Sequence, residues 1–303
     1  MLVGIEGDLL GDSLKRVQRE VDAVFDAAMP VPSDTRARLV EAMRYAAIGG
    51  GKRVRPLLVA STAELFGVSR DAAVRVGTAV EAIHVYSLIH DDLPCMDDDD
   101  LRHGKPTLHH EFDEATAVLA GDSLHALAFE ILADEKTSAD PFTRSELILT
   151  LGTASGMNGM AGGQMMDMVA DEEGVTYDLH TITRLQQLKT GALLAASVEM
   201  GAILGKVPPE GRAHLRAYSR DIGLAFQIAD DLLDVEGDAQ KAGKALRKDE
   251  EQGKQTFVTL MGIDKAREQA RALVDQAVAH LSSHGKEADT LRALARFIVE
   301  RDR

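Results

Sequence analysis

The fold is decided by one stretch, residues 79–100, which reads AVEAIHVYSLIHDDLPCMDDDD. Its first part has the apolar spacing of a core helix, and its second part is crowded with carboxylates. Pro94 lacks a backbone donor and clashes with the preceding turn, so we expect the helix to end or kink near Asp92. Asp97 can then fold back beside Asp91. A solvated acidic loop is the alternative, but it does not explain the apolar helix that delivers the cluster.

A second acidic cluster, residues 230–234, reads DDLLD and also follows an apolar helical run. Asp230 and Asp234 are four residues apart, so both carboxylates lie on one face of a helix. The sequence IADD at 228–231 echoes IHDD at 89–92, which suggests two halves of one site. A polar helix end is the alternative for either cluster taken alone.

The two clusters are a candidate metal site, because crowded carboxylates raise each other's pKa unless a cation neutralises them. Oxygen ligands without His or Cys favour magnesium or calcium, and the offsets of an EF-hand loop are missing. Magnesium completes its shell with water and phosphate oxygens when the protein supplies only one or two carboxylates. The clusters therefore predict a phosphorylated substrate bound between two acidic helix ends.

Basic residues accompany both clusters, as a phosphorylated substrate requires. Residues 49–56 read GGGKRVRP, a glycine-rich turn with three cations that leads into a helix beginning at Pro56. A helix N-terminus with such cations is a natural anion site, although the pattern is not that of a nucleotide P-loop. Each of the other cations, taken alone, is commonly a solvated surface charge. Those next to the motifs are Arg102, His103, Lys105, Lys189, Lys244, Lys248 and Lys254.

The composition excludes several classes of protein. The 303 residues carry 34 Lys and Arg against 49 Asp and Glu, a formal charge of −15, which disfavours binding to nucleic acid or an anionic membrane. The single Cys95 cannot form an intramolecular disulfide. The start of the chain has no signal-peptide pattern, and the most apolar stretch, residues 191–205, is interrupted by Glu199. We therefore expect a cytoplasmic protein without stable membrane insertion.

Helical periodicity dominates the chain, and no run of alternating β-branched residues marks a strand. We expect an all-α fold in one domain over residues 1–303, because no linker rich in Pro, Gly or Ser divides it. Residues 152–168, glycines among methionines, are interpreted as a core helix stabilised by packing. Helix starts are expected after Asp12-Ser13, after Ser33-Asp34, at Pro56, after Asp71, near Asp113, at Pro141, after Thr176, at Pro209 and after Asp264.

These elements together resemble the conserved motifs of the trans-isoprenyl diphosphate synthases. The family's order is followed by GGKRVRP (50–56), HVYSLIHDDLPCMD (84–97), LRHGKPT (101–107), AGD (120–122), GQ (163–164), KTG (189–191), FQ with DDLLD (226–234) and GK (253–254). The match covers nearly the whole chain, and two aspartate-rich motifs with the basic elements between them are highly specific. The subfamily that the chain resembles most is that of the bacterial farnesyl diphosphate synthases.

The resemblance implies a helical bundle around a central cavity, usually a homodimer, with the two acidic motifs facing each other at its mouth. It also implies a set of three Mg²⁺ ions, with isopentenyl diphosphate and an allylic diphosphate, dimethylallyl or geranyl, as substrates. The positions that match metal ligands are Asp91, Asp97, Asp230 and Asp234, supported by Asp92 and Asp231. Catalytic contacts with the allylic diphosphate match Lys189, Thr190, Gln227 and Lys254. Isopentenyl diphosphate contacts match Lys52, Arg55 and His84, and the remaining substrate contacts match Arg102, His103 and Lys244.

The implied reaction is head-to-tail prenyl transfer that yields farnesyl diphosphate and pyrophosphate. Tyr86, with Ser87 beside it, lies about 7–8 Å deeper along the helix than Asp91, and an aromatic ring there resembles the fifteen-carbon producers. A buried structural tyrosine is the alternative for Tyr86. The alternative functions are a geranylgeranyl diphosphate synthase and a noncatalytic partner subunit. A terpene cyclase would leave Lys52, Arg55 and His84 without a second diphosphate.

One position departs from the family pattern. Most members read Leu-Arg-Arg-Gly where this chain has LRHG at 101–104, and the second Arg contacts isopentenyl diphosphate. Histidine is mostly neutral at pH 7 but can gain a proton beside a diphosphate. His103 therefore predicts weaker and more pH-sensitive binding of that substrate.

Overall fold

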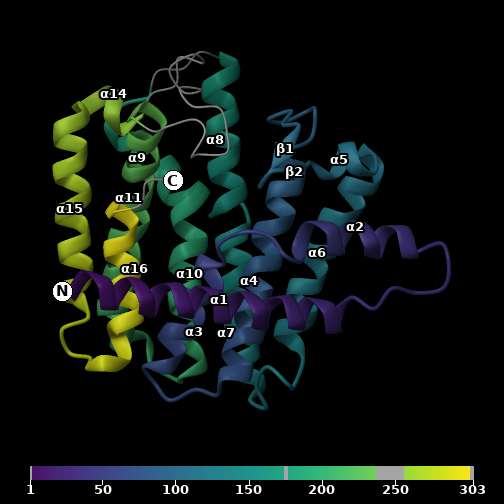
Figure 1. Ribbon diagram of the computed structural model, residues 1–303, viewed down its shortest axis with the longest axis horizontal. Coiled ribbons are helices and arrows are strands. Elements are labelled where there is room, and N and C mark those ends of the chain that lie inside the picture. Colours follow the sequence, from purple (N-terminus) through teal and green to yellow (C-terminus); the bar gives the residue numbers. More distant parts are fainter. Residues whose placement is uncertain (1, 174–176, 237–255, 301–303) are drawn as a thin grey trace.

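The computed structural model describes residues 2–173, 177–236 and 256–300, and it is a bundle of helices (Figure 1). Most of the other long helices run side by side, and the N-terminal helix lies across them. In chain order the first elements are α1 (Leu2–Ala28), α2 (Ala37–Ala47), α3 (Val54–Glu64), α4 (Arg70–Asp91), β1 (Leu101–Arg102), β2 (Lys105–Pro106), α5 (Leu108–Glu111), α6 (Glu114–Ala133) and α7 (Pro141–Ser155). They are followed by α8 (Met160–Glu173), α9 (Leu179–Gln186), the π-helix η1 (Gln187–Gly191), α10 (Ala192–Leu204), the 3₁₀ turn η2 (Pro209–Arg212), α11 (Ala213–Glu236), α14 (Phe257–Met261), α15 (Ile263–His280), η3 (Lys286–Ala288) and α16 (Asp289–Glu300).

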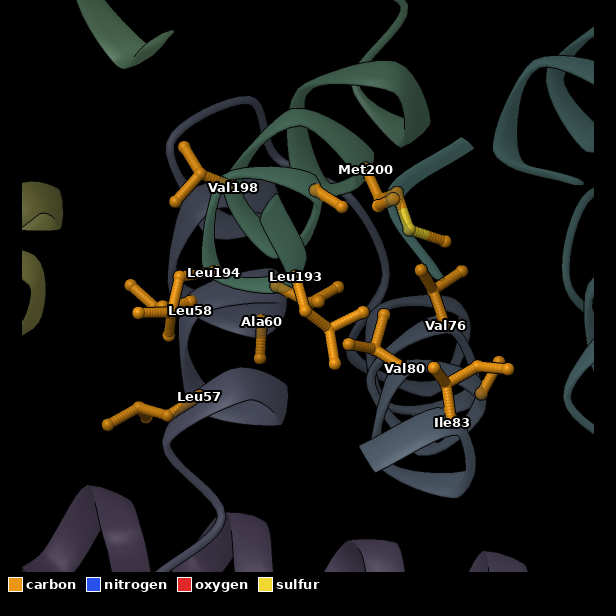
Figure 2. Packing of buried hydrophobic residues seen from close by; sticks show 14 of the residues in the cluster. Leu57, Leu58, Ala60, Val76, Val80, Ile83, Leu193, Leu194, Val198 and Met200 are labelled. Atoms are coloured by element: carbon orange, nitrogen blue, oxygen red, sulfur yellow. The ribbon is translucent and has the colours of Figure 1, made fainter. Parts of the chain in front are cut away.

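The core is built where α4 packs against α3 and α10 (Figure 2). Apolar side chains interdigitate here, and burying each one completely contributes about 1.5–3 kcal/mol. Gly201 of α10 allows the closest approach, because a Cβ atom there would lie 2.7 Å from the carbonyl oxygen of Val59 in α3. The interdigitating side chains are Leu57, Leu58 and Ala60 of α3, Val76, Val80 and Ile83 of α4, and Leu193, Leu194, Val198 and Met200 of α10.

Several predicted helix starts are confirmed by their caps. The side chain of Asp113 accepts a hydrogen bond from Thr116 N at the start of α6. Asp140 does the same for Phe142 N at the start of α7, where Pro141 occupies the first turn. The helices expected after 33–34, at 56, after 71 and after 264 begin within two or three residues of the predicted positions.

Other starts differ from the prediction. Residues 12–13 do not begin a helix, because the apolar face of α1 continues through them from Leu10 to Val17 and Phe25. Pro209 begins only the short turn η2, which precedes α11. The start expected after Thr176 lies at the edge of the described residues, and α9 begins at Leu179 with Asp178 as its cap.

The single helix expected over 152–168 is wrong. It is two helices, because α7 ends at Ser155 and α8 begins at Met160. The glycines make the turn between them: a Cβ atom at Gly159 would lie 2.0 Å from Ala154 O, so only glycine fits. The expectation of no strands is also slightly wrong, since β1 and β2 pair as a small antiparallel hairpin.

Two helices, α4 and α6, have the length and hydropathy of a membrane span. They pack against each other within the bundle, and 67% of the apolar window of α4 is buried inside the protein. The value for α6 is only 44%, so part of its apolar surface is exposed. We therefore interpret α4 as a core helix.

The all-α class expected from the sequence is confirmed.

Candidate active site

A glycine-rich turn connects α2 to α3. Gly49 and Gly51 have φ values of 77° and 72°, and Arg53 has a φ of 55°, all in the left-handed region. Glycine adopts this conformation without a steric penalty, so these residues let the chain reverse tightly before α3 begins at Val54. The turn thereby presents Lys52 and Arg55 to a cavity.

The cavity has a volume of about 550 Å³ and lies between the turn, one face of α4, the β1–β2 hairpin and α16. Apolar side chains line part of it, including Phe226 of α11 and Phe297 of α16. Basic side chains from the turn, the hairpin and α4 line another part. The structure therefore brings together five of the predicted substrate-binding residues, Lys52, Arg55, His84, Arg102 and His103.

These basic groups are crowded and partly desolvated. Burial lowers the pKa of Arg55, and among the described residues none accepts a hydrogen bond from its Nε atom. Burial also lowers the pKa of His84 well below its usual range, and nearby cations, led by Arg55, lower it further. A buried donor without an acceptor is costly. The basic side chains that line the cavity are thus arranged to bind an anion with several oxygens.

The hairpin carries the next pair of basic residues. His103 and Gly104 form its two-residue loop with φ values of 51° and 76°, which is the pattern of a type I′ turn. The His103 ring lies against the glycine-rich turn, since a Cβ atom at Gly50 would be 3.7 Å from its Nδ1 atom. Arg102 Nε donates to Asp92 Oδ1 at 2.9 Å. This ion pair fixes the hairpin to the end of α4.

The first acidic motif folds as its sequence predicts. α4 ends at Asp91, and the backbone N–H of Asp97 donates to Asp91 O at 2.8 Å, which confirms that Asp97 folds back beside Asp91. Burial raises the pKa of Asp91 to about 6, while Lys189 lowers it and Asp97 raises it. Burial likewise raises the pKa of Asp92, against the effect of Arg102. A cation bound nearby would offset this effect of burial.

Lys189 and Thr190 lie in η1, a π-helical turn between α9 and α10. Such turns are rare and occur frequently at functional sites. Lys189 Nζ pairs with Asp167 Oδ2 of α8 at 2.6 Å. Helical periodicity predicted neither the π-helical turn nor the pairing of Lys189 with Asp167. The glycines at 162–163 were the one sequence signal that α8 packs closely against another segment.

The second acidic motif lies on α11, which packs against η1. Asp231 Oδ2 accepts a hydrogen bond from Phe257 N at 2.7 Å and so holds the start of α14. Gln227 lines a smaller cavity of about 200 Å³ between α11 and η1. η1 carries Lys189, whose charge acts on Asp91, and η1 packs against α11, so the π-helical turn links the first acidic motif to the helix that carries the second. Asp230 and Asp234 lie on that helix, whereas Lys244, Lys248 and Lys254 are outside the described residues.

Tyr86 lies on a different face of α4 from the basic cavity. Its ring makes edge contacts with His125 of α6 at 5.0 Å and with His90 at 5.7 Å between ring centroids. Phe129 continues this aromatic row beyond His125. The neighbouring Ser87 donates its hydroxyl to His84 O at 2.9 Å. His125 and Phe129 could not be identified from the sequence, because only the fold places α6 beside this part of α4.

The acidic residues fit Mg²⁺ better than a transition metal. Within the described ranges, no three His, Cys, Asp or Glu side chains gather closely enough to hold a metal ion alone. Asp91 and Asp97 nevertheless offer hard oxygen donors near each other, and a bound cation would offset the effect of burial, which raises the pKa of Asp91. Mg²⁺ is commonly bound by one or two carboxylates, with water and substrate phosphate completing its shell.

Comparison with known proteins agrees with this geometry. Residues 36–295 match the family model described as Polyprenyl synthetase. The chain is 45% identical over 272 residues to the farnesyl diphosphate synthase of Escherichia coli (strain K12), which covers 88% of this chain and 90% of that protein. It is 43% identical over 267 residues to the chloroplastic geranylgeranyl pyrophosphate synthase of Catharanthus roseus, covering 88% of this chain and 74% of that protein.

A solved structure is also similar. The apo crystal structure of an FPP/GFPP synthase from Zymomonas mobilis has a TM-score of 0.89 and 59% sequence identity, and the match covers 96% of this chain and 98% of that one. The chain therefore belongs to the polyprenyl synthetase family.

Proposed function

We propose that this protein is a prenyltransferase that condenses isopentenyl diphosphate with dimethylallyl or geranyl diphosphate to give farnesyl diphosphate and pyrophosphate. The observation that carries the proposal is the cavity of about 550 Å³, which basic residues next to the first acidic motif and a set of apolar residues line together. A molecule with a diphosphate head and a hydrocarbon tail matches this division. Similarity to farnesyl diphosphate synthases over most of the chain supports the same chemistry.

In the proposed reaction, Lys52, Arg55 and His84 hold the diphosphate of isopentenyl diphosphate. Arg55 donates its unsatisfied Nε–H, and the neutral His84 contributes a ring N–H without adding to the crowded positive charge. This arrangement orients the double bond toward the allylic carbon, and such positioning can supply several kcal/mol of the barrier reduction. The five basic residues of the cavity, which also include Arg102 and His103, thereby bind and orient isopentenyl diphosphate.

The allylic diphosphate is placed between the two acidic motifs and η1. Asp91, Asp97, Asp230 and Asp234 would hold Mg²⁺, in a set of three ions, and Asp92 and Asp231 would support them. When bound, Mg²⁺ supplies positive charge that stabilises the departing pyrophosphate. Lys189 lies next to Asp91 and would donate to the same oxygens, together with Thr190, Gln227, Lys244 and Lys254. Removing one such donor typically costs about 3–4 kcal/mol of transition-state stabilisation.

The bond changes are balanced within the two substrates. The allylic carbon–oxygen bond breaks and its electron pair leaves with pyrophosphate. The double bond of isopentenyl diphosphate then forms the new carbon–carbon bond, and a proton is lost to the departing pyrophosphate. Apolar side chains such as Phe226 and Leu88 exclude water, which would otherwise convert the allylic cation to an alcohol.

Tyr86 is proposed to limit the length of the product, with Ser87 beside it. Its ring makes edge contacts with the rings of His125 and His90, which limit its movement. The alternative is a geranylgeranyl diphosphate synthase, which is favoured by similarity to the Catharanthus roseus protein. A noncatalytic partner subunit is the second alternative, and the complete set of acidic residues opposes it.

We also propose that the chain forms a single domain and that two copies assemble as a homodimer. α6 and α7 lie side by side and expose large apolar side chains. Leu119 of α6 is 55% exposed and Leu149 of α7 is 70% exposed, so burying them would favour association. A second copy of this chain packed on this face by two-fold symmetry would bury them. We place the enzyme in the cytoplasm, where its one exposed cysteine, Cys95, stays reduced.

Incubation with Mg²⁺, isopentenyl diphosphate and geranyl diphosphate, followed by chromatography of the prenyl products, tests the proposal. The expected product is farnesyl diphosphate, and its formation should stop when EDTA removes the metal. Geranylgeranyl diphosphate as the main product would favour the first alternative. Absence of any condensation product would favour the noncatalytic subunit.

A further inference from the structure

Arg53 differs from the two other cations of the glycine-rich turn. Its side chain is only 1% exposed, and its backbone is left-handed with a φ of 55°. An L-residue other than glycine rarely adopts this conformation unless the surroundings impose it. The partners that hold Arg53 therefore determine the shape of the turn that carries Lys52 and Arg55.

Three elements supply those partners. Arg53 Nη1 donates to Glu81 Oε1 of α4 at 2.9 Å, and Nη2 donates to Asp22 Oδ1 of α1 at the same distance. Nη2 also donates to the carbonyl oxygen of Ala47 at the end of α2. Two carboxylates thus neutralise this guanidinium, and its Nη atoms tie the turn to α1, α2 and α4.

Asp22 holds the turn at a second point. Its other carboxylate oxygen, Oδ2, accepts a hydrogen bond from the backbone N–H of Gly49 at 3.2 Å. Gly49 and Arg53 are the two ends of the segment that contains Lys52. One carboxylate on α1 therefore connects both ends of the turn, while Glu81 fixes it from the opposite side.

We propose that Asp22 is a positioning residue for the isopentenyl diphosphate site, acting through Gly49 and Arg53 on the placement of Lys52 and Arg55. This inference rests on the function proposed above. Asp22 belongs to α1, which precedes the residues 36–295 matched by the family model. The contribution of α1 to the site was therefore visible only in the fold.

The test compares Asp22→Asn with a matched control, Asp26→Asn. Asp26 lies one turn further along α1 and also pairs with an arginine, Arg44, but it does not contact the glycine-rich turn. For each variant we would measure kcat, the Michaelis constant of each substrate, and the thermal unfolding midpoint. Asp22→Asn should raise the KM for isopentenyl diphosphate about tenfold, the size expected from one lost charge-assisted hydrogen bond.

The KM for geranyl diphosphate and kcat should remain unchanged in Asp22→Asn, and Asp26→Asn should change neither KM. An unchanged KM for isopentenyl diphosphate would overturn the proposal. A parallel change in the KM of both substrates and in kcat would also overturn it. An equal effect of Asp26→Asn would do the same, because each result indicates a general loss of structure. If Asp22→Asn does not fold, Asp22→Glu decides by the same ratio of the two KM values.

Failure of the proposed function gives a different result. If the wild-type protein forms no condensation product, that function is wrong, and affinity for inorganic pyrophosphate is measured by calorimetry instead. Weaker binding by Asp22→Asn than by the wild type and Asp26→Asn would still support the positioning role. Equal affinity in all three proteins would overturn it.

Discussion

Gly163 of α8 lies directly against the backbone of Lys189 in η1. A Cβ atom at Gly163 would be 2.2 Å from Lys189 N and 2.6 Å from its Cα atom, closer than real Cβ contacts allow. Because the obstructing atoms belong to the backbone of a π-helical turn, they cannot move aside as a flexible side chain can. The position of the Lys189 ammonium beside Asp91 and Asp167 therefore depends on this glycine.

Gly163→Ala should displace η1 and lower kcat about a hundredfold, because a displacement near 1 Å at a catalytic group has effects of that size. The free energy of unfolding, measured by thermal denaturation, should fall by about 1–3 kcal/mol because the added methyl group overpacks this contact. Gly11→Ala in α1 is the control, since a Cβ atom there meets nothing within 4 Å. Steady-state kinetics of both variants check the prediction, and full activity in Gly163→Ala would contradict it.

His84 should make the ligand-free protein less stable as the pH falls below about 7. The pKa of His84 is lowered well below its ordinary value of 6.5, mainly by burial, so the unfolded chain binds more protons than the folded protein in this range. Denaturation with urea at pH 7.5 and 5.5 measures the effect. Between pH 7.5 and 5.5, the free energy of unfolding of His84→Gln should fall by about 1 kcal/mol less than that of the wild type.

Asp91 acts in the opposite direction below pH 6, because its pKa in the folded protein is raised to about 6 from 3.8. A folded state that binds more protons gains stability as the pH falls. For this reason the prediction concerns the difference between His84→Gln and the wild type and not the slope of either one. Identical losses in the two proteins would show that His84 is not the group responsible.

His103→Arg should bind isopentenyl diphosphate more tightly and with less dependence on pH. Burial lowers the pKa of His103, and the adjacent Arg102 lowers it further, so the ligand-free imidazole is neutral at pH 7. Binding a diphosphate then requires proton uptake, which becomes harder as the pH rises. The KM for isopentenyl diphosphate, measured from about pH 6 to 8.5, should rise in the wild type and stay flat in the variant. A KM that does not vary with pH in the wild type would refute this role.

Tyr86→Ala should lengthen the prenyl product. Removing the ring opens the space bounded by His125 and His90, into which a longer hydrocarbon tail can extend. Product chromatography checks this, with Tyr86→Phe as the control that keeps the ring and should keep the product. A fifteen-carbon product from Tyr86→Ala would mean that Tyr86 is structural only.

Local features of the fold could be predicted from sequence. Asp113 and Pro141 begin helices because a cap or a fixed φ acts within one turn, and Pro94 ends α4 for the same kind of reason. The course of α1 through residues 12–13 could not be predicted in this way. There, burial of the apolar face of the helix outweighs the local capping preference.

Much of the candidate site was also predictable, because motifs that bind one ligand must converge. Lys52, Arg55, His84, Arg102 and His103 meet in one cavity as expected. The supporting contacts were not predictable, since they depend on tertiary packing. Asp22 of α1 and Glu81 of α4 meet at Arg53 of the glycine-rich turn, and His125 reaches Tyr86 only because α6 lies beside α4.

Calorimetric titration of inorganic pyrophosphate, with and without Mg²⁺, tests the central claim most directly. We predict that Mg²⁺ strengthens binding to the wild-type protein and that Asp91→Asn and Asp230→Asn each abolish this gain, because one bound anion is shared by both acidic motifs. If either variant keeps the full Mg²⁺-dependent affinity, the two motifs do not act on the same pyrophosphate, and the account is contradicted.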